Sequence, residues 1–408
     1  MASAALAGVK ILDLSRVLAA PLATQLLGDL GAEVIKVERP GTGDESREYG
    51  PPFVADREGA ETADSAFYLS CNRNKRSITV DLASAQGQEV IRRLAAEADV
   101  VVENFKTGAL RKYGLDYESL SAVNPRLVYC SVTGFGQTGP FAHKPGYDGV
   151  FQAMSGFMSV SGHPDGEPGG GPMKVGLSMI DILTSFYATV AILGAVYHRD
   201  LHGGPGQHID LALLDCGLAA LSHFAMNYLV SGEVPVRRGN GGFGGIPSQA
   251  FACADGDIFL VAGNNAFFTR LCKAIGRPEL CDDPRFATTA ARIQNREAVV
   301  AVLSEIFRAG TVADWLARLD AADVPCSAVN DLPAALANPQ IQHREMVREV
   351  VHPAGGTVKL LRNPIRYSET PIETYAAPPL VGQDTDDVLG ALGFGADAIA
   401  ALRAAKAI

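Results

Sequence analysis

The chain has 408 residues, more than one compact hydrophobic core usually holds, so two or three domains are expected. Its hydrophobic content of 47% and charged content of 20% are typical of a soluble globular protein. A formal net charge of -10 argues against a general nucleic-acid-binding protein, although local basic clusters can still bind a small anionic ligand.

Cysteine usage and the N-terminus narrow the class of protein further. The seven cysteines are scattered and form no Cys-x-x-Cys pair, which argues against zinc and against a disulfide scaffold. We therefore expect a cytoplasmic protein without a metal. The first residues lack the basic start and long apolar core of a secretory signal. The most apolar run, residues 182–198, is short and contains tyrosine, threonine and serine, so no membrane span is predicted.

The N-terminal region has the pattern of a strand–helix–strand unit. Residues 9–14 are predicted as a short buried strand, and a helix starts at Pro21 and ends at Gly31. Residues 32–38 form the next predicted strand. This order is typical of a parallel sheet and indicates an α/β fold. The first turn lacks Gly-x-Gly-x-x-Gly, and the chain has no Gly-x-x-x-x-Gly-Lys-Ser/Thr phosphate loop.

Strands and helices continue to alternate beyond this unit. Strands are predicted at 77–82 and 99–103, with a helix at 86–97 between them. The loop 104–108 follows the C-terminal end of a strand, where open parallel sheets bind ligands. The basic cluster 72–76 has two interpretations, a solvated surface or an anchor for a phosphate-bearing ligand.

The run 182–198 predicts a buried helix, because apolar residues cover most of its faces. Asp181 stands at its start. An acidic residue in this position has two interpretations. One is an N-cap, and the other is a catalytic carboxylate that the helix dipole holds anionic. From the residue alone, capping is the commoner role.

The composition changes at Gly232, and the glycine-rich segment 237–247 follows. Residues 250–263 alternate as two strands around Asp255-Gly256, which predicts a hairpin. Helices are predicted at 267–275, 292–307 and 312–321. We therefore expect a large domain in 1–231, a smaller α/β domain in 232–330, and a return with the rest of the large domain in 331–408.

Several blocks occur in a fixed order along nearly the whole chain: Ile11–Pro21, Gly31–Arg39, Asn74–Ser77, Val102–Phe105 and Gly203–Asp210. Together they resemble class III CoA-transferases of the CaiB/BaiF type, especially the branch that moves CoA from succinyl-CoA to dicarboxylic acids. The resemblance implies a Rossmann-like large domain built from both chain ends and a smaller α/β domain. It also implies a homodimer of two interlocked, ring-shaped subunits.

The resemblance also places the family's nucleophile on Asp181, counted back from His198-Arg199 along the predicted helix. The carboxylate would attack an acyl-CoA thioester, so CoA is a substrate and no permanently bound cofactor is expected. Exchange of one thioester for another needs little net energy, which agrees with the missing ATP loop. The partners implied are an acyl-CoA and a small carboxylic acid, with no nucleic acid and no membrane.

Two further groups of site residues follow from the resemblance. The glycines of a predicted active-site lid would offer backbone N–H groups to an oxyanion, although a flexible linker is the alternative: Gly241, Gly242, Gly244 and Gly245. The predicted CoA contacts are Leu18, Ala19, Arg39, Leu82, Asn104, Phe105, Lys106, Lys112, Lys144, Tyr147 and Asp148. For Lys106 and Lys144, a solvated lysine is the alternative.

Two departures from the family pattern bear on the substrate. Leu18 replaces a glutamine of the formyl-CoA:oxalate enzymes, which weakens that alternative. Tyr147 replaces the acid–base histidine of the 2-methylacyl-CoA racemases, and tyrosine is a poor substitute for proton exchange. A catalytically silent CoA-binding protein is a further alternative. The cation for the distal carboxylate of a dicarboxylate is left open among Arg47, Arg73, Arg237 and Arg238.

Overall fold

The computed structural model describes residues 4–242 and 244–408, which divide into two compact units. Unit 1 comprises Met1–Phe157, Val175–Gly232 and Arg344–Ile408. Unit 2 comprises Met158–Lys174 and Glu233–His343. Compared with the domains expected from the sequence, unit 2 additionally contains the segment before Asp181 and residues 331–343.

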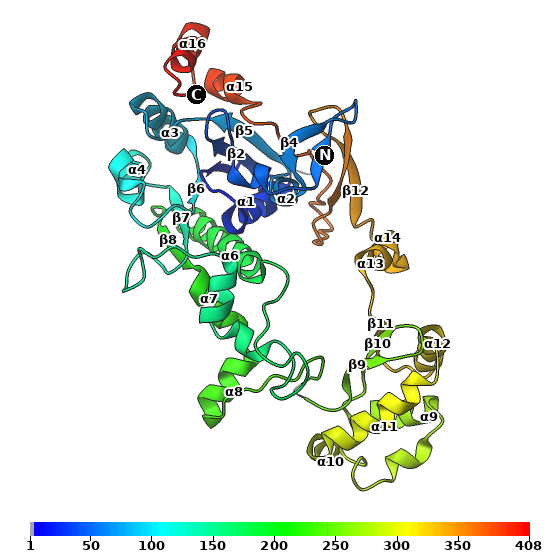
Figure 1. Cartoon of the computed structure of the whole chain (residues 1–408). Helices are drawn as coiled ribbons and strands as arrows, with labels where there is room; N and C mark the ends of the chain where they lie inside the picture. The colour runs from blue at the N-terminus through cyan, green and yellow to red at the C-terminus, as the bar shows by residue number, and fades with distance from the viewer. Residues whose placement is uncertain (1–3, 243) are drawn as a thin grey trace. The chain divides into compact units, whose positions relative to one another are not determined.

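Unit 1 contains a six-stranded sheet in the order β5-β2-β1-β6-β7-β8 (Figure 1). Every neighbouring pair runs parallel, which confirms the predicted α/β class. The strand order reverses between β1 and β6, and open α/β sheets bind their ligands at such a switch point. The strands are β1 (Lys10–Asp13), β2 (Glu33–Glu38), β5 (Lys75–Thr79), β6 (Val100–Glu103), β7 (Val128–Thr133) and β8 (His208–Ala212).

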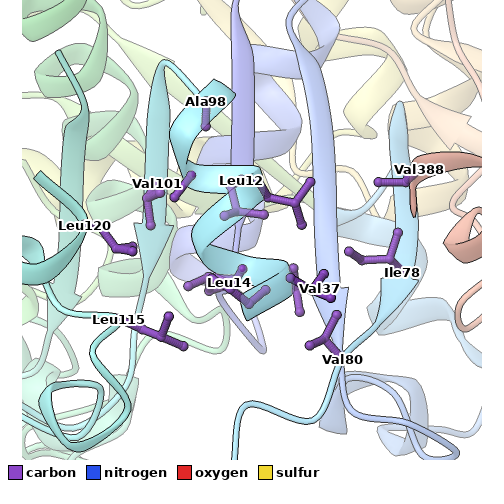
Figure 2. Close-up of a cluster of buried hydrophobic side chains, with 14 of the residues drawn as sticks. Leu12, Leu14, Val37, Ile78, Val80, Ala98, Val101, Leu115, Leu120 and Val388 are labelled. Carbon is purple, nitrogen blue, oxygen red and sulfur yellow. The ribbon is translucent and has the colours of Figure 1, made fainter. Parts of the chain in front are cut away.

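One face of the sheet carries a core to which both ends of the chain contribute (Figure 2). Leu12 and Leu14 from the β1 region pack with Ile78 and with Val388 of α15. Side chains from the N-terminal strands and from the C-terminal helices are therefore buried together, which explains why the chain returns to unit 1. The helices around this core are α3 (Ala85–Glu97), α4 (Tyr117–Val123), α15 (Thr385–Ala391) and α16 (Ala396–Ala404).

The opposite core brings α1 (Ala19–Asp29) and α6 (Met179–His202) together on the sheet. α1 begins two residues before Pro21, the predicted start. α6 has 24 residues and extends beyond the predicted run at both ends. By length and composition alone it could cross a membrane, and the bent pair α7 (Leu213–Ala220) and α8 (His223–Ser231) also passes that test. In this structure Ala188 and Ile192 of α6 lie in the core.

The remaining elements of unit 1 are short. They are β3 (Phe53–Ala55), β4 (Glu61–Ser65), α2 (Ala66–Cys71), α5 (Asp148–Met154), β12 (Val347–Val351), β13 (Thr357–Leu361), and the 3-10 turns η1 (Glu45–Glu48) and η2 (Arg111–Tyr113). A third turn, η3 (Phe157–Val160), spans the first boundary between the units.

Unit 2 is built on a three-stranded antiparallel sheet in the order β11-β10-β9. The predicted hairpin is confirmed as β9 (Ser248–Ala252) and β10 (Asp257–Val261), which close around Phe251 and Ile258. The other elements are α9 (Asn265–Ala274), η4 (Pro278–Cys281), α10 (Thr289–Gln294), α11 (Arg296–Arg308), α12 (Val312–Ala321), β11 (Cys326–Ala328), α13 (Leu332–Ala337) and α14 (Pro339–His343).

Candidate active site

The loops after β1 and β6 meet at the switch point of the parallel sheet. The side chain of Asn104 joins them, since its Oδ1 accepts the Arg16 N–H at 2.9 Å and its Nδ2 donates to the Arg16 carbonyl at 2.7 Å. These paired hydrogen bonds fix the loop after β1 against the loop after β6. Ligand-binding loops at this edge of the sheet are therefore held in one arrangement by backbone contacts.

A cavity of about 250 Å³ opens at this point and has Asp181 in its wall; we call it the Asp181 cavity. Most of the predicted contacts for CoA line it together with Asp181. These are Leu18, Ala19, Asn104, Phe105, Lys106, Lys144, Tyr147 and Asp148. The structure thus gathers predicted residues from three separate segments of the sequence around one carboxylate.

A second cavity of about 360 Å³, the Leu82 cavity, is lined by the predicted residues Arg39, Leu82 and Phe105. The two cavities share Arg16, Glu45 and Phe105 as lining residues. Lys112 lines neither cavity. Its ammonium group lies 4.5 Å from the centre of the ring of Tyr113, which does line the Leu82 cavity.

Asp181 is the third residue of α6, and the N-cap position belongs to Ser178. The interpretation of Asp181 as the N-cap is therefore wrong. Asp148 supplies the missing cap from α5, because its Oδ1 accepts the N–H of Ile180 at 2.7 Å and the N–H of Asp181 at 3.3 Å. The carboxylate of Asp181 is thus not engaged in capping and faces the cavity that it lines.

Burial, followed by the nearby negative charge of Asp148, raises the pKa of Asp181 to about 7. One interpretation of the sequence was a carboxylate that the helix dipole holds anionic. Desolvation and the like charge of Asp148 act against this dipole effect, which is smaller. A carboxyl with a pKa near neutrality in a cavity wall is a common feature of catalytic sites.

Asp148 is itself held on both oxygens. Its Oδ2 accepts from Nε2 of Gln152 at 2.6 Å, and Gln152 also binds the backbone of Val175 and Leu177. Asp148 and Gln152 together therefore position the segment that leads into Asp181.

Sequence reasoning missed Glu103, the last residue of β6. Its carboxyl accepts the Phe105 N–H at 2.7 Å, so it shapes the loop that lines both cavities. Burial raises the pKa of Glu103 to about 7, even though hydrogen bonds from Ser131 and from the Phe105 backbone lower it. An acidic residue that ends an otherwise apolar strand, Val-Val-Val-Glu, is the signal that could have identified it.

A network of buried ion pairs, also missed, lies beneath the loops. Lys36 pairs with Asp44 at 2.7 Å, Arg47 with Glu38 at 2.7 Å, and Lys75 with Asp13 at 2.9 Å. Asp44 also accepts the N–H of Val17, a β-branched residue with the unusual φ of 71°. The network thus holds the turn before α1 in a conformation that it would not adopt alone.

The ion pairs also correct the interpretation of several cations. Arg73 and Lys75 of the basic cluster are buried against Asp29 and Asp13, so they form neither a solvated surface nor a phosphate anchor. Arg47 is buried between Glu38 and Asp64. Neither Arg47 nor Arg73 lines the Asp181 cavity, which makes both unsuitable for a distal carboxylate.

The predicted lid glycines and the other two candidate arginines, Arg237 and Arg238, belong to unit 2. Arg237 pairs with Asp165 of the same unit. Both ends of the glycine loop are tied down, because Arg296 donates to the Gly242 carbonyl at 2.9 Å and Arg292 to the Ile246 carbonyl at 2.7 Å. Gly244 has open space around it, and Gly245 lies so close to Gly263 that a side chain would collide. The role of this loop as a lid stays a prediction.

No group of three or more His, Cys, Asp or Glu side chains that could hold a metal occurs in the described ranges 4–242 and 244–408.

The chain is similar to known proteins in both sequence and structure. Residues 6–385 match the family model for CoA-transferase family III. The chain is 43% identical to a succinate–glutarate CoA-transferase of Agrobacterium fabrum over 95% of both chains. It is 42% identical to a human succinyl-CoA:glutarate CoA-transferase over 94% of this chain and 85% of the relative. The crystal structure of a CaiB/BaiF family protein from Brucella suis superposes with a TM-score of 0.85 at 44% identity, covering 96% of this chain and 100% of the other.

Proposed function

The chain belongs to CoA-transferase family III, and from that membership we propose that it transfers CoA from succinyl-CoA to a small dicarboxylic acid. Two similar relatives carry names that specify succinate or succinyl-CoA together with glutarate, so glutarate is the first acceptor to test. The observation that supports the transfer chemistry best is the position of Asp181, a carboxylate in the wall of a cavity that shares lining residues with a second cavity.

The proposed reaction begins when the ionised carboxylate of Asp181 attacks the thioester carbonyl of the donor. The carbon–sulfur bond breaks, CoA leaves as a thiolate, and a mixed anhydride forms between Asp181 and the donor acid. The thiolate then attacks the Asp181 side of the anhydride. This step releases the donor carboxylate and leaves an aspartyl-CoA thioester.

The acceptor completes the cycle by the reverse sequence. Its carboxylate attacks the aspartyl-CoA thioester, and the released thiolate attacks the new anhydride at the acceptor carbonyl. The new acyl-CoA is formed and Asp181 returns as a carboxylate. No net proton is consumed, so the main requirement on the protein is that Asp181 is ionised when the thioester arrives.

Backbone and side-chain donors near Asp181 would stabilise each tetrahedral oxyanion. We assign this role to the glycine loop of Gly241, Gly242, Gly244 and Gly245, acting as a lid. Within unit 1, the CoA contacts are proposed for the predicted residues that line the two cavities. We further propose that the protein acts in the cytoplasm as an interlocked homodimer, as the resemblance to the family implies.

The test is an activity screen of succinyl-CoA against mono- and dicarboxylic acids, with the Asp181→Asn variant beside the wild type. We expect transfer to glutarate or a related dicarboxylate, and no transfer by the variant. Asp215→Asn is the matched control, because Asp215 also lies in the first turn of a helix but is exposed and lines neither cavity. Deuterium uptake at the α-carbon of a 2-methylacyl-CoA, without any acceptor, would instead support a racemase and contradict the proposal.

A further inference from the structure

The Asp181 cavity and the Leu82 cavity have three lining residues in common, Arg16, Glu45 and Phe105. Arg16 forms an ion pair with Glu45 of η1. Its guanidinium group also lies 4.8 Å from the centre of the Phe105 ring, a cation–π contact. A ligand that occupies both cavities would therefore lie against Arg16, which lines both of them.

The backbone of Arg16 is fixed by the two hydrogen bonds to Asn104, but its side chain is incompletely satisfied. The Nε atom is buried and has no hydrogen-bond partner in the part of the chain that the structure describes. A buried donor without an acceptor is costly, so this N–H indicates a place for an acceptor atom of a ligand.

The bond to Glu45 is of a kind that a ligand can replace. The side chain of Arg16 is 37% exposed and that of Glu45 is 49% exposed. Ion pairs between exposed side chains contribute little to stability, because water and salt screen them. An anion with two or more acceptor oxygens satisfies the planar guanidinium group better than one carboxylate at the edge of the group.

We propose that Arg16 binds the diphosphate of CoA and that Glu45 holds its guanidinium group in place until the ligand replaces it. This inference rests on the proposed function, which places the nucleotide in the Leu82 cavity and the thioester beside Asp181. The diphosphate lies between these two ends of CoA, so its charge would lie beside the residues that both cavities share. Glu45 is then a competitor whose removal strengthens CoA binding, while loss of Arg16 weakens it.

The experiment measures the binding of CoA and of pantetheine, which lacks the diphosphate, by calorimetry on the full chain. We expect Arg16→Gln to weaken CoA binding at least about tenfold, the loss typical of a charge-assisted contact. Glu45→Gln should strengthen CoA binding by about two- to fivefold, since it removes one exposed competing charge. Pantetheine binding should change less than about twofold in either variant. The double variant should behave like Arg16→Gln alone, and Arg16→Lys should lie between Arg16→Gln and the wild type.

Arg76→Gln and Glu33→Gln are matched controls, because this ion pair has side chains 37% and 44% exposed and lines neither cavity. They should leave CoA binding unchanged. If Glu45→Gln leaves CoA binding unchanged or weakens it, the proposal is wrong. An equal loss of succinyl-pantetheine and succinyl-CoA turnover in Arg16→Gln would assign Arg16 to the acyl carboxylate and also overturn it. A wild-type chain that binds CoA as expected but transfers none would contradict the proposed function and leave this proposal standing.

Discussion

Two groups of buried carboxylates lie close together in unit 1 and behave in opposite ways. In the first group, beneath the loops, Asp13, Glu38 and Asp44 each have a lysine or arginine partner. In the second group, at the cavity and the strand end beside it, Glu103 and Asp181 have no ion-pair partner among residues 4–242 and 244–408. Burial alone would raise the pKa of all five carboxyls.

Whether a buried carboxyl has a cationic partner decides the direction in which its pKa shifts. Against the effect of burial, Lys36 and hydrogen bonds hold the pKa of Asp44 well below its usual range, and Lys75 with Lys36 lowers the pKa of Asp13. Without such cations, the pKa values of Glu103 and Asp181 rise to about 7. Paired carboxylates here serve to hold the loops, whereas unpaired ones retain the reactivity that a nucleophile or a proton-sensitive group requires. Four predictions test this contrast, in order of decreasing effect.

The largest effect is expected from Asp181→Asn. An amide at this position cannot form the anhydride, so steady-state transfer should fall by at least about 10³-fold, as when other enzymes lose their nucleophile. The variant should still bind CoA, because the substitution leaves both cavities intact. Residual activity above about one-tenth of the wild-type rate would contradict a nucleophilic role.

The second prediction concerns the paired group. Lys36→Met removes positive charge beside the buried carboxylates of Asp44 and Asp13. Breaking a buried ion pair in this way typically costs about 3–5 kcal/mol of stability. Urea denaturation should show a lower free energy of unfolding by that order. Lys10→Met, which breaks an exposed pair with Glu97, is the control and should change stability by less than about 1 kcal/mol.

The third prediction uses pH and stability. A carboxyl with a raised pKa in the folded state takes up protons on folding, so its contribution falls as pH rises from the unfolded value through about 7. Asp181→Asn and Glu103→Gln should therefore be more stable than wild type at pH 8, by about 1–3 kcal/mol. This advantage should shrink as pH falls toward the unfolded pKa of each carboxyl. Asp44→Asn should show the opposite, with a loss at pH 8 that shrinks as pH falls below the unfolded pKa of Asp44.

The smallest effect is expected from Asp148→Asn. The amide oxygen can still accept the N–H groups of Ile180 and Asp181, but the like charge beside Asp181 is removed. The pKa of Asp181 should fall, so the acidic limb of the pH–rate profile should move to lower pH by about one unit. A limb that does not move would show that burial alone sets the pKa of Asp181.

Much of the fold could be predicted from local patterns. The buried strands and the amphipathic helix α3 were located to within about three residues, because apolar runs and periodicity report burial directly. The ends of α6 were not located as closely, because Met179 and His202 lie outside the continuous apolar run. The segment 158–174 was assigned to the large domain because neighbouring residues in sequence give no signal of which unit they pack in.

At the candidate site, even less could be predicted from local sequence patterns. The catalytic role of Asp181 is a prediction from the sequence, but its pKa depends on Asp148 and on burial, and both are consequences of tertiary structure. Arg73 and Lys75 looked like a basic surface because their partners, Asp29 and Asp13, are distant in sequence. Ion pairs between residues that are distant in sequence leave no local pattern. Counting charges along the sequence therefore could not show that these two cations are buried.

The proposed transfer reaction requires a covalent intermediate at Asp181. The full chain would be incubated with succinyl-CoA, treated with hydroxylamine, digested with trypsin and examined by mass spectrometry. The peptide Val175–Arg199 contains Asp181 as its only acidic residue. We predict a hydroxamate on Asp181 that forms only with the thioester present and is absent from Asp181→Asn. An enzyme that transfers CoA while this peptide stays unmodified would contradict the central claim.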